Sequence, residues 1–272
     1  MLIDTHCHIN VLVKKSFDEF DLPITPQELI QADQVVQEAA LAGVTTILNV
    51  GTSLVESINC ITLAHRYTHV FAAIGVHPND LTHEWKEDIQ ALENYLKKKD
   101  EYKIVALGEC GIDKHYPGYN LDRQKDAFKR HIELALTYDL PLVVHSRDAA
   151  EETYQCLQEF KSPALRGTIH CFSEDHFWAQ EALSLGFVLG IGGTITYPKN
   201  GILRSVVQTV GIDHIILETD APFLPPQTMR GKKNHPRFIA TIAEYIATLL
   251  NLPLKEVAEK TTHTAEQLFK LG

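Results

Sequence analysis

The chain has 272 residues, of which 44% are hydrophobic, and this is enough to bury one substantial core. Its formal net charge of −10 and its pI near 5.8 argue against a broad electrostatic grip on nucleic acid, although a strand held locally beside bound cations is compatible with them. The sequence has no run of about eighteen apolar residues, no signal-peptide pattern in MLIDTHCHIN, and five cysteines without a C-x-x-C pair. We therefore expect a cytoplasmic protein with reduced thiols and no membrane span.

Eight short apolar segments have the composition of strands. In chain order they are Leu2–His8, Thr45–Val50, Val70–Val76, Ile104–Gly108, Pro141–His145, Gly167–His170, Phe187–Ile191 and His214–Glu218. Most are apolar throughout and do not alternate with polar residues, which is typical of parallel strands buried on both faces.

Segments with helical spacing lie between these strands. The clearest are Pro26–Ala42, followed by Gly43 as a C-cap, then Gln124–Tyr138 and Ile239–Leu250, and the last helix falls within Phe238–Gly272. Repeated strand–helix alternation predicts an α/β fold, a single-domain (β/α)8 TIM barrel over residues 1–272. An open, doubly wound parallel sheet is the alternative.

Ionisable side chains follow several of the predicted strands. Because the carboxyl ends of barrel strands meet at one rim, we expect these side chains to converge. They are His6, His8, Glu109, His145, His170 and Asp220. An isolated H-x-H pair is more often structural, but an ionisable group after a buried strand is costly unless it is paired or binds metal. Six such groups of ligand type favour a metal centre.

The composition of this set indicates which metals it suits. Mixed imidazole and carboxylate ligation favours Zn, Mn, Fe or Ni, whereas a site lined only by oxygen suits Mg or Ca better. Six ligands exceed what one catalytic ion with an open position needs. Two ions about 3.5–4 Å apart that share a carboxylate would account for the number.

The segments DTHCH, GECGID, PLVVHSRDA, HCFS and ETDAPFL occur in this order along the chain, together with IGVHP and RGKKN. In this respect the whole chain resembles the TatD family of metal-dependent deoxyribonucleases, within the amidohydrolase-like barrel superfamily. The resemblance implies that Glu109 bridges two divalent ions (Mg, Mn or Zn), one held also by His6, His8 and Asp220 and the other by His145 and His170.

The same resemblance implies a reaction. The family hydrolyses phosphodiester bonds, so we expect a 3′–5′ DNA exonuclease that acts on single strands or DNA ends through an activated water. Asp220 would accept the proton of that water, and Glu109 would be the second catalytic carboxylate.

Four further residues are candidates for substrate contact. His77 ends the third predicted strand, and Arg147 follows His145 by two residues, although a salt bridge with Asp148 or Glu151 is nearly as well supported. Arg230 and Lys232 belong to a short basic cluster with Lys233 in the long segment Ala221–His235, where solvated surface is the alternative.

Several neighbouring residues receive structural interpretations. We expect Asp4 to be a buried hydrogen-bonding partner, and the cysteines beside the ligands, Cys7, Cys110 and Cys171, to point away from the site. Rim packing is favoured over base stacking for three aromatic residues, Tyr116, Tyr119 and Phe223.

Some positions depart from the family pattern and leave the substrate open. They are Lys114, His115, Glu174, Asp175, His235 and Thr264. Two alternatives to the nuclease are therefore kept: a barrel hydrolase for a small amide, lactone or phosphoester, and a barrel without catalysis that serves as a scaffold. A monomer is the expected state.

Overall fold

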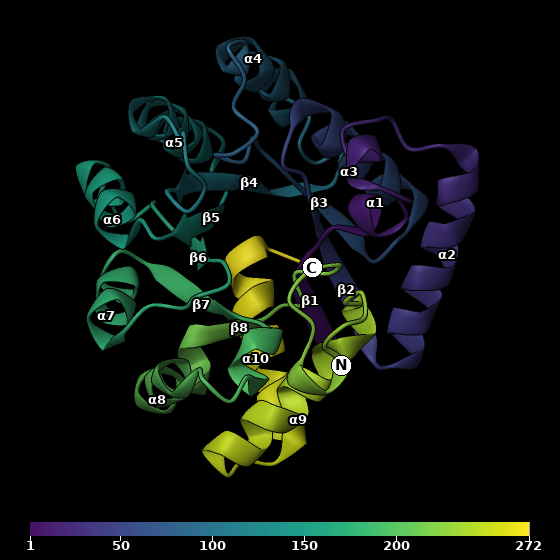
Figure 1. Ribbon diagram of the computed structural model, residues 1–272, viewed down its shortest axis with the longest axis vertical. Helices are drawn as coiled ribbons and strands as arrows, with labels where there is room; N and C mark the ends of the chain where they lie inside the picture. Colours follow the sequence, from purple (N-terminus) through teal and green to yellow (C-terminus); the bar gives the residue numbers. More distant parts are fainter. Residues whose placement is uncertain (272) are drawn as a thin grey trace.

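Eight parallel strands form the centre of the molecule, and helices surround them (Figure 1). The computed structural model describes residues 1–271. The strands are β1 (Leu2–Cys7), β2 (Val44–Val50), β3 (Val70–Ile74), β4 (Ile104–Asp113), β5 (Leu142–Arg147), β6 (Gly167–Ile169), β7 (Phe187–Ile191) and β8 (Ile215–Leu217). They pair in consecutive order from β1 to β8.

The helices alternate with these strands. They are α1 (Ile9–Leu12), α2 (Pro26–Leu41), α3 (Leu54–Arg66), α4 (Trp85–Leu96), α5 (Leu121–Tyr138), α6 (Ala150–Glu159), α7 (His176–Ser184), α8 (Gly201–Val210), α9 (Ile239–Leu250) and α10 (Leu254–Phe269). Side-chain caps fix several of their starts, as where Thr25 and Glu28 form a capping box before α2 and Asn120 caps α5.

Hydrogen bonds link β1 and β8, and the residues that directly follow them, and so bring the ends of the sheet together. The His8 N–H group donates to the Ala221 carbonyl at 2.8 Å, and the Asp220 N–H group donates to the His6 carbonyl at 2.9 Å. The Thr5 hydroxyl donates to the Leu217 carbonyl at 2.9 Å. The predicted (β/α)8 barrel is therefore confirmed, and the open doubly wound sheet is wrong.

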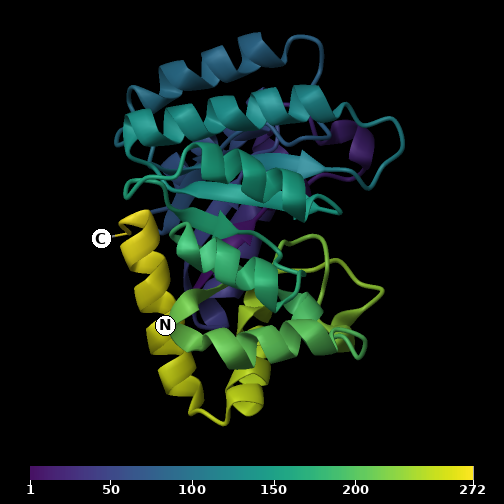
Figure 2. The same ribbon diagram turned by 90° about the vertical axis from the view of Figure 1, so that its left-hand side faces the viewer.

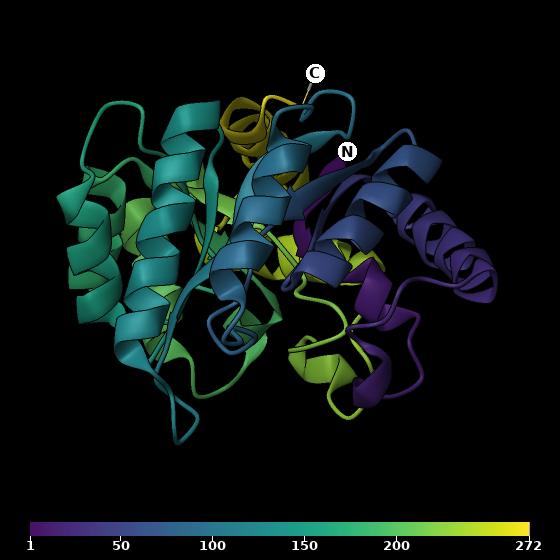
Figure 3. The same ribbon diagram turned by 90° about the horizontal axis from the view of Figure 1, so that it is seen from above.

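Helix α10 closes the end of the barrel at which the strands begin (Figure 2). Its residues Ala265, Leu268 and Phe269 pack against side chains inside the barrel, among them Ile3 and Leu48. At the opposite end, the segments after β1 and β8 lie side by side (Figure 3), and the Lys233 ammonium donates to the Lys14 carbonyl at 3.3 Å. Apolar packing fills the end at which the strands begin. A site for a ligand is therefore expected at the end where the strands finish.

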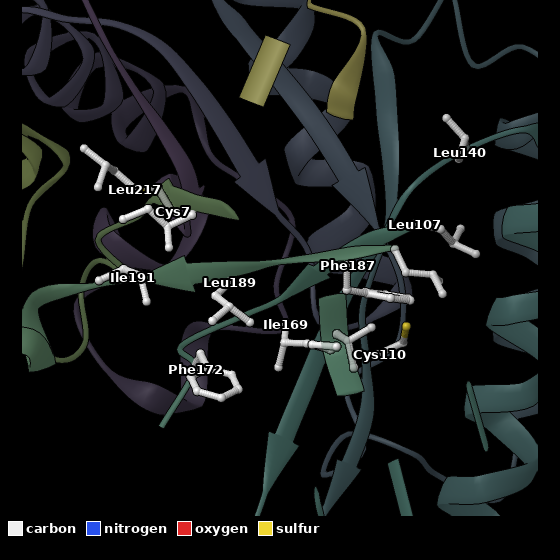
Figure 4. Packing of buried hydrophobic residues seen from close by; sticks show 14 of the residues in the cluster. Cys7, Leu107, Cys110, Leu140, Ile169, Phe172, Phe187, Leu189, Ile191 and Leu217 are labelled. Carbon is white, nitrogen blue, oxygen red and sulfur yellow. The ribbon is translucent and has the colours of Figure 1, made fainter. Parts of the chain in front are cut away.

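A second apolar layer fills the space between the strands and the surrounding helices. Figure 4 shows part of it, with Phe187 and Leu189 of β7 beside Ile169 and Phe172. Burial of this layer anchors each strand, so that the residues that follow the strands are held in fixed positions.

Irregularities in two strands change the direction of functional side chains. The pairing register shifts between Asp4 and Cys7 in β1, and again between Leu107 and Cys110 in β4. Such bulges bend a strand and re-aim its side chains, and here they let Glu109 face inward while Cys110 packs outward.

Strand β4 runs five residues beyond the predicted end at Gly108, so that prediction of the boundary was wrong. The extension depends on close contact with β5. A Cβ atom at Gly108 would lie 2.4 Å from the Val143 carbonyl oxygen, and one at Gly111 would lie 1.9 Å from the His145 carbonyl oxygen. Both glycines have φ of 143°, which side chains rarely tolerate. The two glycines of GECGID are therefore requirements of the backbone.

Among residues 1–271, no single helix has the length and apolar composition of a membrane span. The segments Pro236–Leu250 and Leu254–Phe269 reach that length and composition only when taken together, and they are bent by 112° where they meet.

Candidate metal centre

His6 and His8 present their Nε2 atoms to one point. These two atoms are 3.0 Å apart, and both rings are buried. The Nδ1–H group of His8 donates to the Val50 carbonyl at 2.8 Å, which fixes the ring with its Nε2 atom directed to this point. The Nδ1 atom of His6 is buried and has no hydrogen-bond partner in the described part of the chain.

Asp220 follows β8 and faces the same point. Its Oδ1 atom lies 3.3 Å from His8 Nε2, 3.8 Å from His6 Nε2 and 3.8 Å from His170 Nε2. Burial alone would raise the pKa of the Asp220 carboxyl, but the adjoining imidazole of His8, and then His170, hold that pKa below its usual range. The carboxylate is therefore charged.

Asp4 holds the segment that carries Asp220. Its carboxyl accepts hydrogen bonds from the Thr219 N–H group at 2.9 Å and from the Thr219 hydroxyl at 2.6 Å. Burial raises the pKa of Asp4 to about 8. Asp4 is thus confirmed as a buried hydrogen-bonding partner.

Glu109 lies between two groups of imidazoles. Its Oε2 atom is 3.3 Å from His6 Nε2, whereas its Oε1 atom is 2.9 Å from His145 Nδ1 and 3.8 Å from His77 Nε2. Burial opposes ionisation of the carboxyl, yet the positive fields of His6 and His170 hold the pKa of Glu109 well below its usual range. Each oxygen of one ionised carboxylate therefore faces a different set of nitrogen donors.

These donors form overlapping sets that fit divalent cations. In each set the ligand atoms lie within 4.8 Å of one another: His6, His8 and Asp220; His6, Glu109 and His170; and His77, Glu109 and His145. All six residues predicted as ligands are therefore brought together. Buried carboxylates beside several imidazole nitrogens are the donor set of a mixed nitrogen and oxygen metal site.

Two carboxylates that sequence reasoning did not assign to the site support the histidines. Glu218 Oε1 lies 2.9 Å from His170 Nδ1, and Asp113 Oδ2 lies 3.1 Å from His145 Nε2. Metal-binding histidines usually direct their second nitrogen to such a carboxylate, which fixes the orientation of the ring. The only signal in the sequence was the extra acid in each of ETD and GECGID.

The three cysteines beside the ligands do not all behave as predicted. Cys7 and Cys110 pack in the outer apolar layer, as expected. Cys171 does not point away, because strand β6 ends at Ile169 and Cys171 has a φ of 47°, so that strand alternation no longer applies. Its sulfur lies in one group with His170 and Glu218.

A cavity of about 820 Å³ opens above this centre. His77 and Arg147 line it, and so do Tyr116 and Phe223; contact of His77 and Arg147 with a substrate stays a prediction. Within residues 1–271, Arg147 has no ion pair with Asp148 or Glu151; its guanidinium lies 5.5 Å from the centre of the Tyr116 ring.

The basic cluster lies elsewhere. Neither Arg230 nor Lys232 lines the cavity, and the Arg230 guanidinium is 4.9 Å from the centre of the Tyr197 ring. Contact of these two residues with a substrate stays a prediction.

The cavity is acidic. In addition to Glu109, Asp113 and Asp220, five carboxylates line it: Asp18, Asp21, Glu56, Asp80 and Asp88. Among the described residues, Arg147 is its one arginine or lysine. A polyanion would therefore be repelled from much of this wall unless cations were bound.

Several departures from the family pattern have structural partners. Asp175 caps α7 by accepting from the N–H groups of Phe177 and Trp178. Lys114 pairs with Glu152 at 2.6 Å, and His115 lies 2.9 Å from Asp148. Two others are also bonded locally: the His235 side chain accepts from the Arg237 N–H group, and the Thr264 hydroxyl donates to the Lys260 carbonyl.

Comparison with known proteins places the chain in a family. A family model described as "TatD related DNase" matches residues 3–270. The chain is 32% identical over 272 residues to the uncharacterized metal-dependent hydrolase YabD of Bacillus subtilis (strain 168), with 100% of both chains covered. It is 32% identical over 270 residues to the uncharacterized metal-dependent hydrolase YcfH of Escherichia coli (strain K12), covering 99% of this chain and 96% of that relative.

Solved structures agree with this assignment. The crystal structure of YjjV, a TatD homologue from Escherichia coli K12, aligns with a TM-score of 0.88 and 28% sequence identity, and covers 100% of this chain and 98% of that one. From the match over nearly its whole length, the chain belongs to the family of TatD-related DNases.

Proposed function

We propose that this protein is a metal-dependent hydrolase that removes nucleotides from the 3′ end of DNA, preferring single strands or ends. The observation that carries the proposal is Glu109, whose two oxygens face His6 and His145 on opposite sides. This arrangement suits a carboxylate that bridges two divalent ions (Mg, Mn or Zn), and the description of the family model, TatD related DNase, supports DNA as the substrate.

The residues of the centre would divide into two groups of ligands. His6, His8 and Asp220 would hold one ion with Glu109, and His145 and His170 would hold the other. His77 lies close enough to Glu109 and His145 to assist there. When bound, the two ions supply a lowered pKa for an attacking water and neutralise the charge that develops on the phosphoryl group.

The protein's own groups contribute orientation and proton transfer. The bond from His8 to Val50 and the contact of His145 with Asp113 fix both rings before substrate arrives. The ionised Asp220, 3.3 Å from His8, is placed to accept the proton of the attacking water. Arg147, on the cavity wall, offers a planar pair of donors to a phosphate.

A second candidate function follows from the acidic lining of the cavity. A small amide, lactone or phosphoester would meet less repulsion there than a nucleic acid does. A scaffold without catalysis gains nothing from six converging donors, and we do not favour it.

The test is hydrolysis of an end-labelled single-stranded oligonucleotide. The protein is purified without metal, and Mg²⁺, Mn²⁺ or Zn²⁺ is then restored while the products are followed with the label at either end. We expect metal-dependent stepwise shortening from the 3′ end, lost in Glu109→Ala and His145→Ala. His83→Ala, which removes an imidazole whose side chain is 87% exposed, is the matched control. Intact oligonucleotide at verified metal occupancy would reject the nuclease and favour the small-molecule substrate.

A further inference from the structure

A second cavity adjoins the one above the metal centre. Its volume is about 360 Å³, near the lower end of the range for sites that take one small molecule. Asn79, Leu81 and Tyr116 line both cavities. The two cavities therefore share a wall, and a ligand at the metal centre lies next to the side cavity.

Two half-exposed tyrosines form the wall of the side cavity. Tyr116 is 54% exposed and Tyr119 is 45% exposed, so part of each side chain is accessible to a ligand. Arg147 lies 5.5 Å from the centre of the Tyr116 ring and lines only the first cavity, so Tyr116 stands at the boundary of the two. Flat, accessible aromatic rings next to a cation are the surfaces on which unpaired bases stack.

Polar groups connect the side cavity with the metal centre. The Asn79 side chain donates to Asp113 Oδ2 at 2.9 Å, and the same oxygen lies 3.1 Å from His145 Nε2. A molecule that contacts Asn79 therefore contacts the network that orients His145. The Asn120 amide, whose oxygen caps α5, lines the cavity as well and can pair with the edge of a base.

The charges of the two cavities differ in sign. The first is lined by many carboxylates, whereas the lining of the second includes Arg123 and, within residues 1–271, no aspartate or glutamate. A negatively charged strand leaving the centre therefore meets less repulsion along Tyr116 than along carboxylates of the first cavity such as Asp18 and Asp21.

We propose that the side cavity binds one unstacked base of the strand being cut, that of the terminal nucleotide or of the one before it, and stacks it on Tyr116 and Tyr119. This inference rests on the proposed function and adds to it a base-binding subsite. One base fits the volume, and a paired base would first have to leave its duplex.

The experiment compares oligonucleotides that differ by one base. Single strands are prepared with an abasic residue at the terminal or at the penultimate position of the digested end. Initial rates give kcat and KM for the wild type, Tyr119→Ala and Tyr119→Phe. Phe177→Ala is the matched control, because Phe177 is 60% exposed and lines neither cavity.

For the wild type, we expect loss of one of the two bases to raise KM about tenfold or more with little change in kcat. Tyr119→Ala should raise KM for the normal strand similarly and should be insensitive to the abasic residue, since both changes remove the same contact. Phe177→Ala should resemble the wild type, and Tyr119→Phe, which keeps the ring, should recover most of the rise in KM seen in Tyr119→Ala. Equal KM values of the wild type for normal and abasic strands would overturn the subsite while leaving the nuclease intact. The same holds if the abasic residue raises KM as much in Tyr119→Ala as in the wild type.

If the wild type hydrolyses no oligonucleotide, the proposed function fails. The existence of the base-binding subsite can then still be tested by measuring nucleotide binding. Calorimetry with the dinucleotide dTpdT and metal-loaded protein should then show affinity that Tyr119→Ala loses and Phe177→Ala keeps. Equal binding by Tyr119→Ala, or none by the wild type, would refute it.

Discussion

Asp113→Asn should weaken the metal centre although Asp113 is not among the proposed ligands. Asp113 Oδ1 accepts from the His115 N–H group at 2.8 Å, and Oδ2 faces the Asn79 amide and His145 Nε2 at 2.9 and 3.1 Å. If the carbonyl oxygen of the new amide keeps its bond with His115, its NH2 group meets the Asn79 donor. In the wild type, the Asp113 carboxylate keeps the proton of His145 on Nε2, so that Nδ1 faces Glu109 with a free lone pair. In Asp113→Asn this acceptor is lost.

The expected fall in metal affinity and in kcat/KM can be estimated from the lost contact between Asp113 and His145. A hydrogen bond to a charged group contributes about 1.5–3 kcal/mol, which corresponds to roughly 10- to 150-fold. Substitution of such supporting carboxylates typically lowers metal affinity or activity 10- to 100-fold. We therefore expect kcat/KM at limiting Mn²⁺ and the Mn²⁺ affinity each to fall about 10- to 100-fold, as measured by initial rates and calorimetry.

Asp148→Asn is the matched control for this change. Asp148 also contacts a histidine, at 2.9 Å from His115 Nδ1, but its side chain is 63% exposed and lies outside the centre. It should leave both quantities unchanged, because an exposed pair contributes little. The reasoning is refuted if Asp113→Asn, with a thermal midpoint near that of the wild type, retains Mn²⁺ affinity and kcat/KM within roughly twofold.

Four further results are expected. When its metal content is matched to that of the wild type by added metal and checked by elemental analysis, Asp220→Asn should still lower turnover; wild-type turnover would exclude Asp220 as the proton acceptor. Gly111→Ala places a Cβ atom 1.9 Å from a β5 carbonyl oxygen at φ 143°, so urea unfolding should show a loss of about 3 kcal/mol or more. Burial lowers the pKa of His131 in the folded protein to about 4. In the unfolded chain this imidazole binds a proton at higher pH, so the free energy of unfolding falls as pH falls from 6.5 toward 4. Urea unfolding of His131→Gln should therefore vary by about 2 kcal/mol less between about pH 7.5 and pH 5 than that of the wild type, and an equal variation would contradict this. Finally, if Arg147 and Arg123 alone meet phosphates, log kcat/KM should fall with log salt with a slope of only about −1.4, and a slope several times steeper would show other contacts.

The barrel and the six converging donors could be predicted because both depend on local patterns. Apolar runs mark buried strands, and polar residues such as His145 and Asp220 at their ends must meet at one rim. The end of β4 could not be predicted, since Gly108 and Gly111 look like turn residues until the approach of β5 shows why a strand requires them.

Contacts between distant residues account for most of what the sequence did not reveal. Asp113 and His145 are 32 positions apart, and Glu218 and Cys171 are 47 apart, so their pairing depends on strand register that no local pattern encodes. Cys171 was misplaced for a related reason, because a φ of 47° after β6 turns its side chain out of the alternation of the strand.

A net charge of −10 does not exclude a nucleic-acid substrate, because what matters is where the charges lie relative to the site. The carboxylates of the first cavity lie beside the donors that fit divalent cations, and bound cations would offset them only over a short range in salt solution. Among the described residues that line the two cavities, Arg147 and Arg123 are the arginines, and no lysine is present, so attraction of a strand inside the cavities beyond that range depends on these two. If the proposed function holds, recognition of a nucleic acid inside the cavities depends on a few contacts near the cut bond, among which the proposed stacking on Tyr116 and Tyr119 needs no net positive charge.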